Sequence, residues 1–88
     1  MKRDPKIITS DLSKTVSKDG VVVEVHIFRL EKETGWALEV VNENNTSTTW
    51  DDLFPSDEAA FAEFTRVVTE EGIEAFMDGL NVVPFQRQ

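Results

Sequence analysis

The stretch DGVVVEVHIFRL, residues 19–30, decides the fold. The residues after its glycine are rich in valine, isoleucine and phenylalanine, a composition typical of a β-strand. Asp19-Gly20 is a strong signal for a two-residue hairpin turn, because both central positions of that turn need a positive φ angle. The stretch therefore predicts a hairpin whose second strand, residues 20–30, is the longest of the chain.

The turn at residues 19–20 also determines the register of the strand before it. It places Val16 opposite Val23 and Leu12 opposite Ile27. Apolar residues meet in both pairs, so this register gives the hairpin one apolar face. We therefore expect the first strand to begin near Leu12.

Residues 31–34 fit a four-residue loop that returns the chain beside the long strand. That loop pairs Leu38 with Ile27, so apolar residues again share one face. It also sets Trp36 against Arg29, where the guanidinium can lie over the indole ring. We expect a cation–π contact at this end of the sheet.

Residues 43–45 fit a three-residue turn in which Asn45 adopts the left-handed conformation. This turn sets Trp50 against Leu38. A two-residue turn at 44–45 would direct Trp50 to the opposite face of the sheet. The three-residue turn is preferred, because the tryptophan then completes the apolar row.

The apolar period changes from 2 to 3.6 after Pro55. Ser56 is a natural N-cap, and Asp57 and Glu58 suit the first helical turn, near the positive end of the helix dipole. Gly72 is expected to end the helix, and a short helical turn follows it. The apolar stripe of the helix consists of Ala60, Phe61, Phe64, Val67 and Val68.

These elements predict an α+β fold: a four-stranded antiparallel β-meander with one C-terminal helix and a short helical turn packed on one face. A single sheet with one apolar face needs such a cover. The inner face of the sheet is predicted to comprise Leu12, Val16, Val21, Val23, Val25, Ile27, Trp36, Leu38, Val40 and Trp50.

The length of 88 residues predicts a single domain spanning residues 1–88. Residues 1–6 are expected to form a flexible end and residues 80–88 a tail, in which Pro84 favours a sheet edge or a packed segment. The sequence has no cysteine and no apolar run of signal-peptide or membrane-spanning length. We therefore expect a cytoplasmic protein without a membrane partner.

The formal net charge of −8 at pH 7 makes the chain strongly acidic. Carboxylates concentrate in residues 51–78, where Arg66 is the only cation. Such a surface repels phosphate backbones, so nucleic acid is not expected as the main partner.

Catalytic and metal-binding patterns are weak. Asp51-Asp52 offers hard oxygen donors, but adjacent strand residues point to opposite faces, so we interpret the pair as capping and solubilising. His26 is the only histidine, and in the predicted register it lies opposite Glu39, which indicates a surface ion pair. No catalytic triad or phosphate loop is recognisable. We expect no enzymatic activity, no cofactor and no metal site.

The outer face of the predicted sheet is more apolar than a solvated face should be. Either the C-terminal tail folds over it, or another molecule binds it, most simply a second copy related by twofold symmetry. The candidate interaction surface comprises Val22, His26, Phe28, Leu30, Glu39 and Val41 on the sheet, with Val83 and Phe85 in the tail.

The segments that carry a family resemblance are Asp19-Gly20, residues 35–41, residues 49–52, Phe54, residues 59–60 and residues 70–76. Together they resemble a family of small, uncharacterised bacterial proteins, often described as hypothetical or plasmid-related. The resemblance spans about residues 18–78 and implies a fold but no established activity. In topology alone, the order of elements also resembles the positive-cofactor and Whirly type of single-stranded-nucleic-acid binders, which use basic, aromatic sheet surfaces.

The leading hypothesis is a small, acidic, non-enzymatic interaction domain that self-associates through the outer sheet face or the C-terminal tail. One alternative is single-stranded nucleic-acid binding through basic side chains and aromatic stacking groups. Another is mimicry of nucleic-acid phosphate by the acidic helix, which would bind a basic protein. The residues of the nucleic-acid alternative are Lys14, Lys18, Arg29 and Lys32, with Trp36 or Phe28 for stacking.

Overall fold

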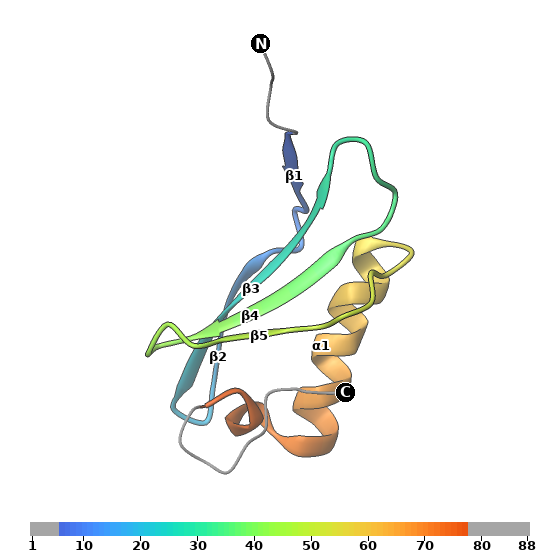
Figure 1. The fold of residues 1–88 in the computed structure, drawn as a ribbon. Coiled ribbons are helices and arrows are strands. Elements are labelled where there is room, and N and C mark those ends of the chain that lie inside the picture. Colours follow the sequence, from blue (N-terminus) through green and yellow to red (C-terminus); the bar gives the residue numbers. More distant parts are fainter. Residues whose placement is uncertain (1–5, 78–88) are drawn as a thin grey trace.

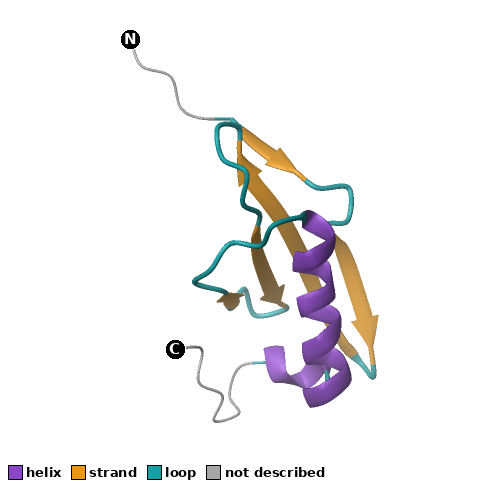
Figure 2. Cartoon of the chain, turned by 90° about the vertical axis from the view of Figure 1, so that its right-hand side faces the viewer, coloured by secondary structure: helices purple, strands orange, loops and turns teal. Residues whose placement is uncertain are grey.

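The computed structural model describes residues 6–77 (Figure 1). The elements are β1 (Ile7–Thr9), β2 (Lys14–Lys18), β3 (Val21–Leu30), β4 (Ala37–Asn42), β5 (Ser47–Thr49), α1 (Asp57–Glu71) and the 3-10 helix η1 (Ile73–Phe76). The strands form one antiparallel sheet, and α1 and η1 lie on the same face of it (Figure 2). The predicted α+β fold class is therefore confirmed. Neither helix within residues 6–77 combines the length and the apolar character needed to cross a membrane.

β3 organises the sheet. It pairs with β4 on one side and with both β1 and β2 on the other, and β5 adds to the far side of β4. The predicted meander is present, but its first strand is divided into β1 and β2, which follow one another along the same edge of β3 (Figure 1). The predicted pairs that the register confirms are Val16 with Val23, Ile27 with Leu38 and His26 with Glu39.

The turn residues adopt the conformations that their sequences favour. Asp19 and Gly20 have φ angles of 55° and 81°, as a hairpin turn with two positive-φ positions requires. Asn45 has a φ angle of 66°, and Asn42 N donates to Thr46 O at 3.0 Å, which closes the three-residue turn. Both turn predictions are confirmed.

The predicted pairing of Leu12 with Ile27 is wrong. The chain leaves the ladder between β1 and β2, and Leu12 lies in the turn that joins them. Ser10 N donates to Ile27 O at 2.8 Å, while Ser13 Oγ accepts from Ile27 N at 3.0 Å and donates to Ile27 O at 3.2 Å. A side-chain hydroxyl thus replaces the backbone groups of a strand residue, and Leu12 still packs against the core.

Ser13→Ala should destabilise the domain by about 1–3 kcal/mol, because the amide of Ile27 in the central strand loses its hydrogen-bond partner. Urea unfolding followed by circular dichroism measures the change. Ser17→Ala, at an exposed position of β2, is the matched control and should change the free energy of unfolding by less than about 0.5 kcal/mol. Equal stability of the two variants would contradict the role given to Ser13.

Trp36 lies beyond the strand pairing predicted for it. The β3–β4 ladder ends at Phe28 and Ala37, and Trp36 forms an isolated bridge with Phe54. The pair predicted between Trp36 and Arg29 is therefore wrong as a backbone pair. The predicted cation–π contact is nevertheless present, because the Arg29 guanidinium lies 5.2 Å from the centre of the Trp36 ring.

Trp50 joins the end of the sheet to the helical layer. The β4–β5 ladder ends at Thr49, one residue short of the pair predicted between Trp50 and Leu38. The Trp50 ring still packs against the core, and its indole Nε1 donates to Glu63 Oε2 on α1 at 3.1 Å. Its ring centroid lies 6.4 Å from that of Phe76 in η1. The predicted orientation of Trp50 toward the core is therefore correct.

The core lies between the sheet and the helical layer. Ser56 Oγ accepts from Ala59 N at 3.0 Å, and Gly72, with a φ angle of 90°, ends the helix, so both predicted helix boundaries are confirmed. The predicted inner face and helix stripe are either buried in this core or packed against it. The buried hydrophobic residues are Val23, Val25, Ile27, Leu38, Val40, Ala60, Phe64, Val67, Ile73 and Phe76.

Two buried polar residues, Ser10 and Asn42, tie the sheet to the helices. Ser10 Oγ donates to Asp57 Oδ2 at 2.7 Å, which joins the turn after β1 to the first turn of α1. Asn42 Nδ2 donates to Phe76 O at 2.8 Å, which joins β4 to η1. The helical layer is therefore fixed at both ends by hydrogen bonds as well as by apolar contacts.

Candidate interaction surface

The face of the sheet opposite α1, called the outer face, presents a mixed set of side chains. Both α1 and η1 lie on the other face, and residues 6–77 contain no further helix (Figures 1 and 2). Because side chains alternate along a strand, the register assigns each strand residue to one face. The outer face comprises Ile7, Thr9, Thr15, Ser17, Val22, Glu24, His26, Phe28, Leu30, Ala37, Glu39, Val41, Ser47 and Thr49.

An apolar patch crosses β1, β3 and β4 at one end of the outer face. It consists of Ile7, Phe28, Leu30 and Ala37, in which Ile7 pairs with Leu30 and Phe28 pairs with Ala37. The exposed fractions of Ile7 and Leu30 are 62% and 37%. Adjoining exposed apolar side chains of this kind make this end of the outer face a candidate contact site.

A shallow hollow of about 210 Å³ adjoins the apolar patch. Its lining residues are Ile7, Thr9, His26, Phe28 and Glu39. The sequence pattern predicts His26, Phe28 and Glu39 on this surface but not Ile7 and Thr9, because it indicates a first strand that begins near Leu12. The run of β-branched residues from Ile7 to Thr9 is the signal that could have identified β1.

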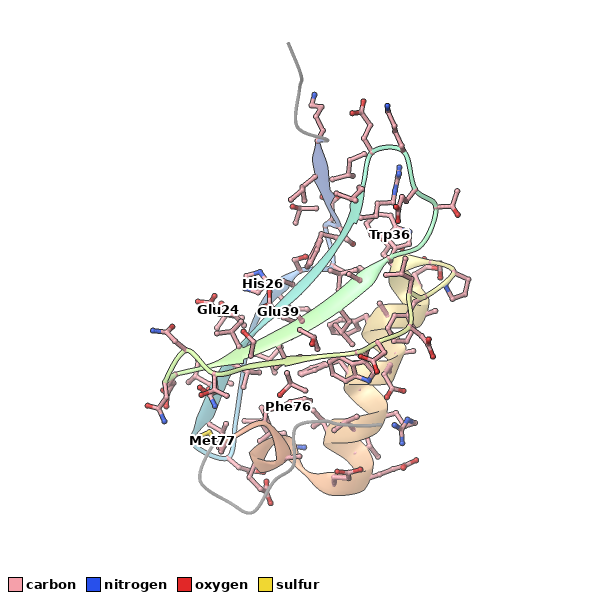
Figure 3. The ribbon with its side chains drawn as sticks, in the orientation of Figure 1. Glu24, His26, Trp36, Glu39, Phe76 and Met77 are labelled. Carbon is pink, nitrogen blue, oxygen red and sulfur yellow. The ribbon has the colours of Figure 1, made fainter. Side chains whose placement is uncertain are left out.

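Three titratable side chains, Glu24, His26 and Glu39, form a polar trio on the same face. His26 Nε2 lies 3.3 Å from Glu24 Oε1, and His26 faces Glu39 across the β3–β4 ladder (Figure 3). The register predicted for His26 is confirmed, but the predicted ion pair with Glu39 is wrong. The imidazole contacts Glu24, two residues away on its own strand, because alternate residues of a strand share a face.

The remaining predicted surface residues divide into two groups. Val22 and Val41 lie on the outer face, next to the turns at the other end of the sheet from the apolar patch. All the predicted sheet residues of the candidate interaction surface are therefore on one face. Val83 and Phe85, the tail residues of the same prediction, lie outside the described residues.

Asp51 and Asp52 are exposed in the bend between β5 and α1. Within residues 6–77, no group of three or more His, Asp or Glu side chains is arranged to hold a metal ion. The structure thus brings no third ligand to this pair from the described part of the chain.

An ion-pair network lies on α1. Arg66 donates to Glu63 at 2.8 and 2.9 Å and to Glu70 Oε1 at 2.9 Å. The hydrogen bond from Arg66 lowers the pKa of the Glu63 carboxyl, burial opposes this effect, and the hydrogen bond from Trp50 lowers the pKa further. The contacts with Glu63 and Glu70 raise the pKa of Arg66.

The Glu63 carboxyl should make stability depend on pH in acid. Because its pKa in the folded state lies below its ordinary value of 4.5, its contribution is present above that value and is lost as the pH falls through the folded pKa. In thermal unfolding, the stability of the wild type relative to Glu63→Gln should therefore decrease below a pH of about 4.5. The matched control is Glu33→Gln, at an exposed loop position. The stability of this variant should change with pH in the same way as the stability of the wild type. A difference between wild type and Glu63→Gln that stays constant down to a pH of about 2 would refute this prediction.

Comparisons with known proteins give no match: a scan of protein-family models, a search of curated proteins and a search of solved structures each find none. The resemblances to a small bacterial family and to Whirly-type domains therefore stay predictions.

Proposed function

We propose that this chain is a small non-enzymatic interaction domain that self-associates through the outer face of its sheet. The observation that carries the proposal is the apolar patch on the face opposite α1. An antiparallel sheet with one solvated face normally alternates apolar and polar residues cleanly. Apolar side chains on three adjacent strands favour a partner that removes them from water.

The outer face is large enough for a modest protein interface. β3 has 10 residues, so at about 3.3 Å per residue it is about 33 Å long. Four strand positions at a spacing of about 4.8 Å give a width of roughly 15–20 Å. The other strands are shorter than β3, with 3, 5, 6 and 3 residues in β1, β2, β4 and β5, so two copies packed through such faces would bury roughly 800–1,000 Å² in total, within the range of weak and transient interfaces. A weak, concentration-dependent dimer is therefore the expected assembly.

A second copy is the simplest occupant of this face. A twofold axis through the face lets the same patch serve both partners, so self-complementarity is the only requirement. Two sheet faces can also interdigitate their side chains, as the two layers of a β-sandwich do.

Single-stranded nucleic-acid binding has weaker support. By register, Lys14 lies on the inner side of the sheet, with its Nζ 5.1 Å from the centre of the Phe61 ring. Arg29 lies over Trp36 on that side, whereas Phe28 is on the outer face. Lys14 and Arg29 are thus on the opposite side of the sheet from Phe28, although a single strand needs cations and stacking groups on one surface.

Mimicry of phosphate by the acidic helix also has weaker support. Arg66 forms ion pairs with both Glu63 and Glu70, so a cation already lies within the acidic surface of α1. A basic protein would have to compete with Arg66 for these carboxylates.

Light scattering coupled to size-exclusion chromatography tests the proposal over loading concentrations from about 1 μM to 1 mM, the range in which a weak dimer forms. The wild type should shift from monomer to dimer. Phe28→Glu and Ile7→Glu place a charge in the apolar patch and should remain monomeric. Ala62→Glu places the same charge on an exposed position of α1 and should dimerise like the wild type.

Two results would overturn the proposal. One is a wild-type protein that stays monomeric at the highest concentration. The other is dimerisation that neither Phe28→Glu nor Ile7→Glu weakens relative to Ala62→Glu.

A further inference from the structure

We infer that His26 makes self-association through the outer face depend on pH, with a tighter dimer in mild acid than at neutral pH. The inference rests on the proposed function, because it concerns the same surface. Its basis is the place of the polar trio beside the hollow, where a second copy would remove these side chains from water.

His26 has one carboxylate beside it on its own strand and another on the neighbouring strand. Its Nε2 is 3.3 Å from Glu24 Oε1, and Glu39 lies directly across the ladder (Figure 3). His26 and Glu39 both line the hollow, together with Ile7 and Phe28 of the apolar patch. A partner that covers the patch therefore also covers the imidazole and at least one carboxylate.

The strands packed beside β3 and β4 add no compensating charge on this face. The neighbours that β1, β2 and β5 contribute next to the trio are Thr9, Thr15 and Thr49, all neutral. Among the strand residues of the outer face within residues 6–77, His26 is thus the one that can become a cation.

Protonation of His26 changes the cost of bringing two outer faces together. Each face carries a charge of −2 from Glu24 and Glu39 when the imidazole is neutral, and −1 when it is protonated. Removing a carboxylate from water is costly unless a cation accompanies it. An imidazolium supplies that cation to the carboxylates of its own copy and of the partner. Association should therefore take up protons and tighten as the pH falls through the range in which histidine titrates.

The composition of the chain allows the effect of His26 protonation to be distinguished from the titration of other side chains. The sequence contains one histidine and no cysteine. Between pH values of about 7.5 and 5.5, histidine is the side chain that ordinarily changes charge, whereas carboxylates titrate at lower pH. A change in dimer affinity across this interval that His26→Gln abolishes reports on His26, because any other group that titrates near neutral pH is the same in both proteins.

Analytical ultracentrifugation of the wild type and of His26→Gln at pH values of about 7.5 and 5.5 tests the inference. The wild-type dimer dissociation constant should fall roughly threefold to thirtyfold in acid, because each copy gains one cation and individual partly exposed ion pairs are weak. The dissociation constant of His26→Gln should change by less than about twofold. In about 0.5 M salt the wild-type change should shrink, because salt screens the charges.

The outcomes distinguish the inference from the proposed function. A wild-type dimer with the same or a larger dissociation constant in acid overturns the inference and leaves the proposed function intact. An equal pH effect in the wild type and in His26→Gln also overturns the inference, because another group then takes up the proton. A wild type that stays monomeric at both pH values overturns the proposed function, and the inference with it.

Discussion

Phe64→Ala should lower the free energy of unfolding by about 3–5 kcal/mol. The Phe64 side chain is only 3% exposed and lies in the middle of the helical stripe that faces the sheet. Its ring stacks on Phe76 at a centroid distance of 5.6 Å and lies 5.7 Å from the ring of Phe61. Truncation leaves a cavity between α1 and η1. A chain of 88 residues has a total stability of only about 4–13 kcal/mol, so this single change brings the domain close to unfolding.

Urea unfolding followed by circular dichroism measures the loss, with Phe61→Ala as the matched control. Phe61 lies on the same helix and undergoes the same truncation, but its ring is only partly buried. The control should cost about 1–2 kcal/mol, because less apolar surface is lost from the core. If Phe61→Ala proved as costly as Phe64→Ala, the helix face assigned to the core would be wrong.

Most of the sheet could be predicted from turn chemistry and strand alternation. The turns at Asp19-Gly20 and Asn45 need positive φ angles, and at each turn one register keeps the apolar residues on one face of the sheet. Ser56 indicates the start of α1 because its side chain caps the first turn, and Gly72 indicates the end because it adopts a positive φ angle. These residues act through the local backbone, and local backbone preferences are readable in the sequence.

The features that could not be predicted depend on hydrogen bonds between distant segments. Ser13 substitutes for a strand residue because its hydroxyl reaches Ile27, and Asn42 is buried because its amide reaches Phe76. In the sequence, both residues resemble ordinary polar positions of a turn or a strand end. Periodicity compares residues two to four positions apart, so it contains no information on these contacts.

The candidate surface was predictable to a similar extent. Alternation assigned Phe28 and Leu30 to the outer face, and residue type showed that this face is unusually apolar. Ile7 and Thr9 were missed because β1 has 3 residues, which is too short for a periodic signal. The partner that binds the outer face could not be predicted, because periodicity describes which residues share a face and not which surface they contact.

Asn42→Ala is expected to cost about 2–4 kcal/mol, because one buried side chain supports three backbone groups. Its Nδ2 donates to Phe76 O at 2.8 Å. Its Oδ1 accepts from Asn44 N at 2.8 Å and from Thr46 N at 3.1 Å. Asn42 is only 4% exposed, so water does not readily replace these bonds. The substitution therefore weakens both the β4–β5 turn and the attachment of η1.

Hydrogen exchange shows whether Asn42→Ala loosens η1 locally or lowers the stability of the whole domain. Hydrogen exchange of the Met77 amide, which donates to Glu74 O across η1, should accelerate more than exchange of the β3 amides. Glu43→Ala, at an exposed position of the same turn, should change neither the exchange rate of the Met77 amide nor the exchange rates of the β3 amides. Equal acceleration in η1 and β3 would show that Asn42 acts on global unfolding alone. Selective acceleration in η1 would show that the carbonyl of Phe76, and with it the ring that packs against Phe64, is held in place from the sheet.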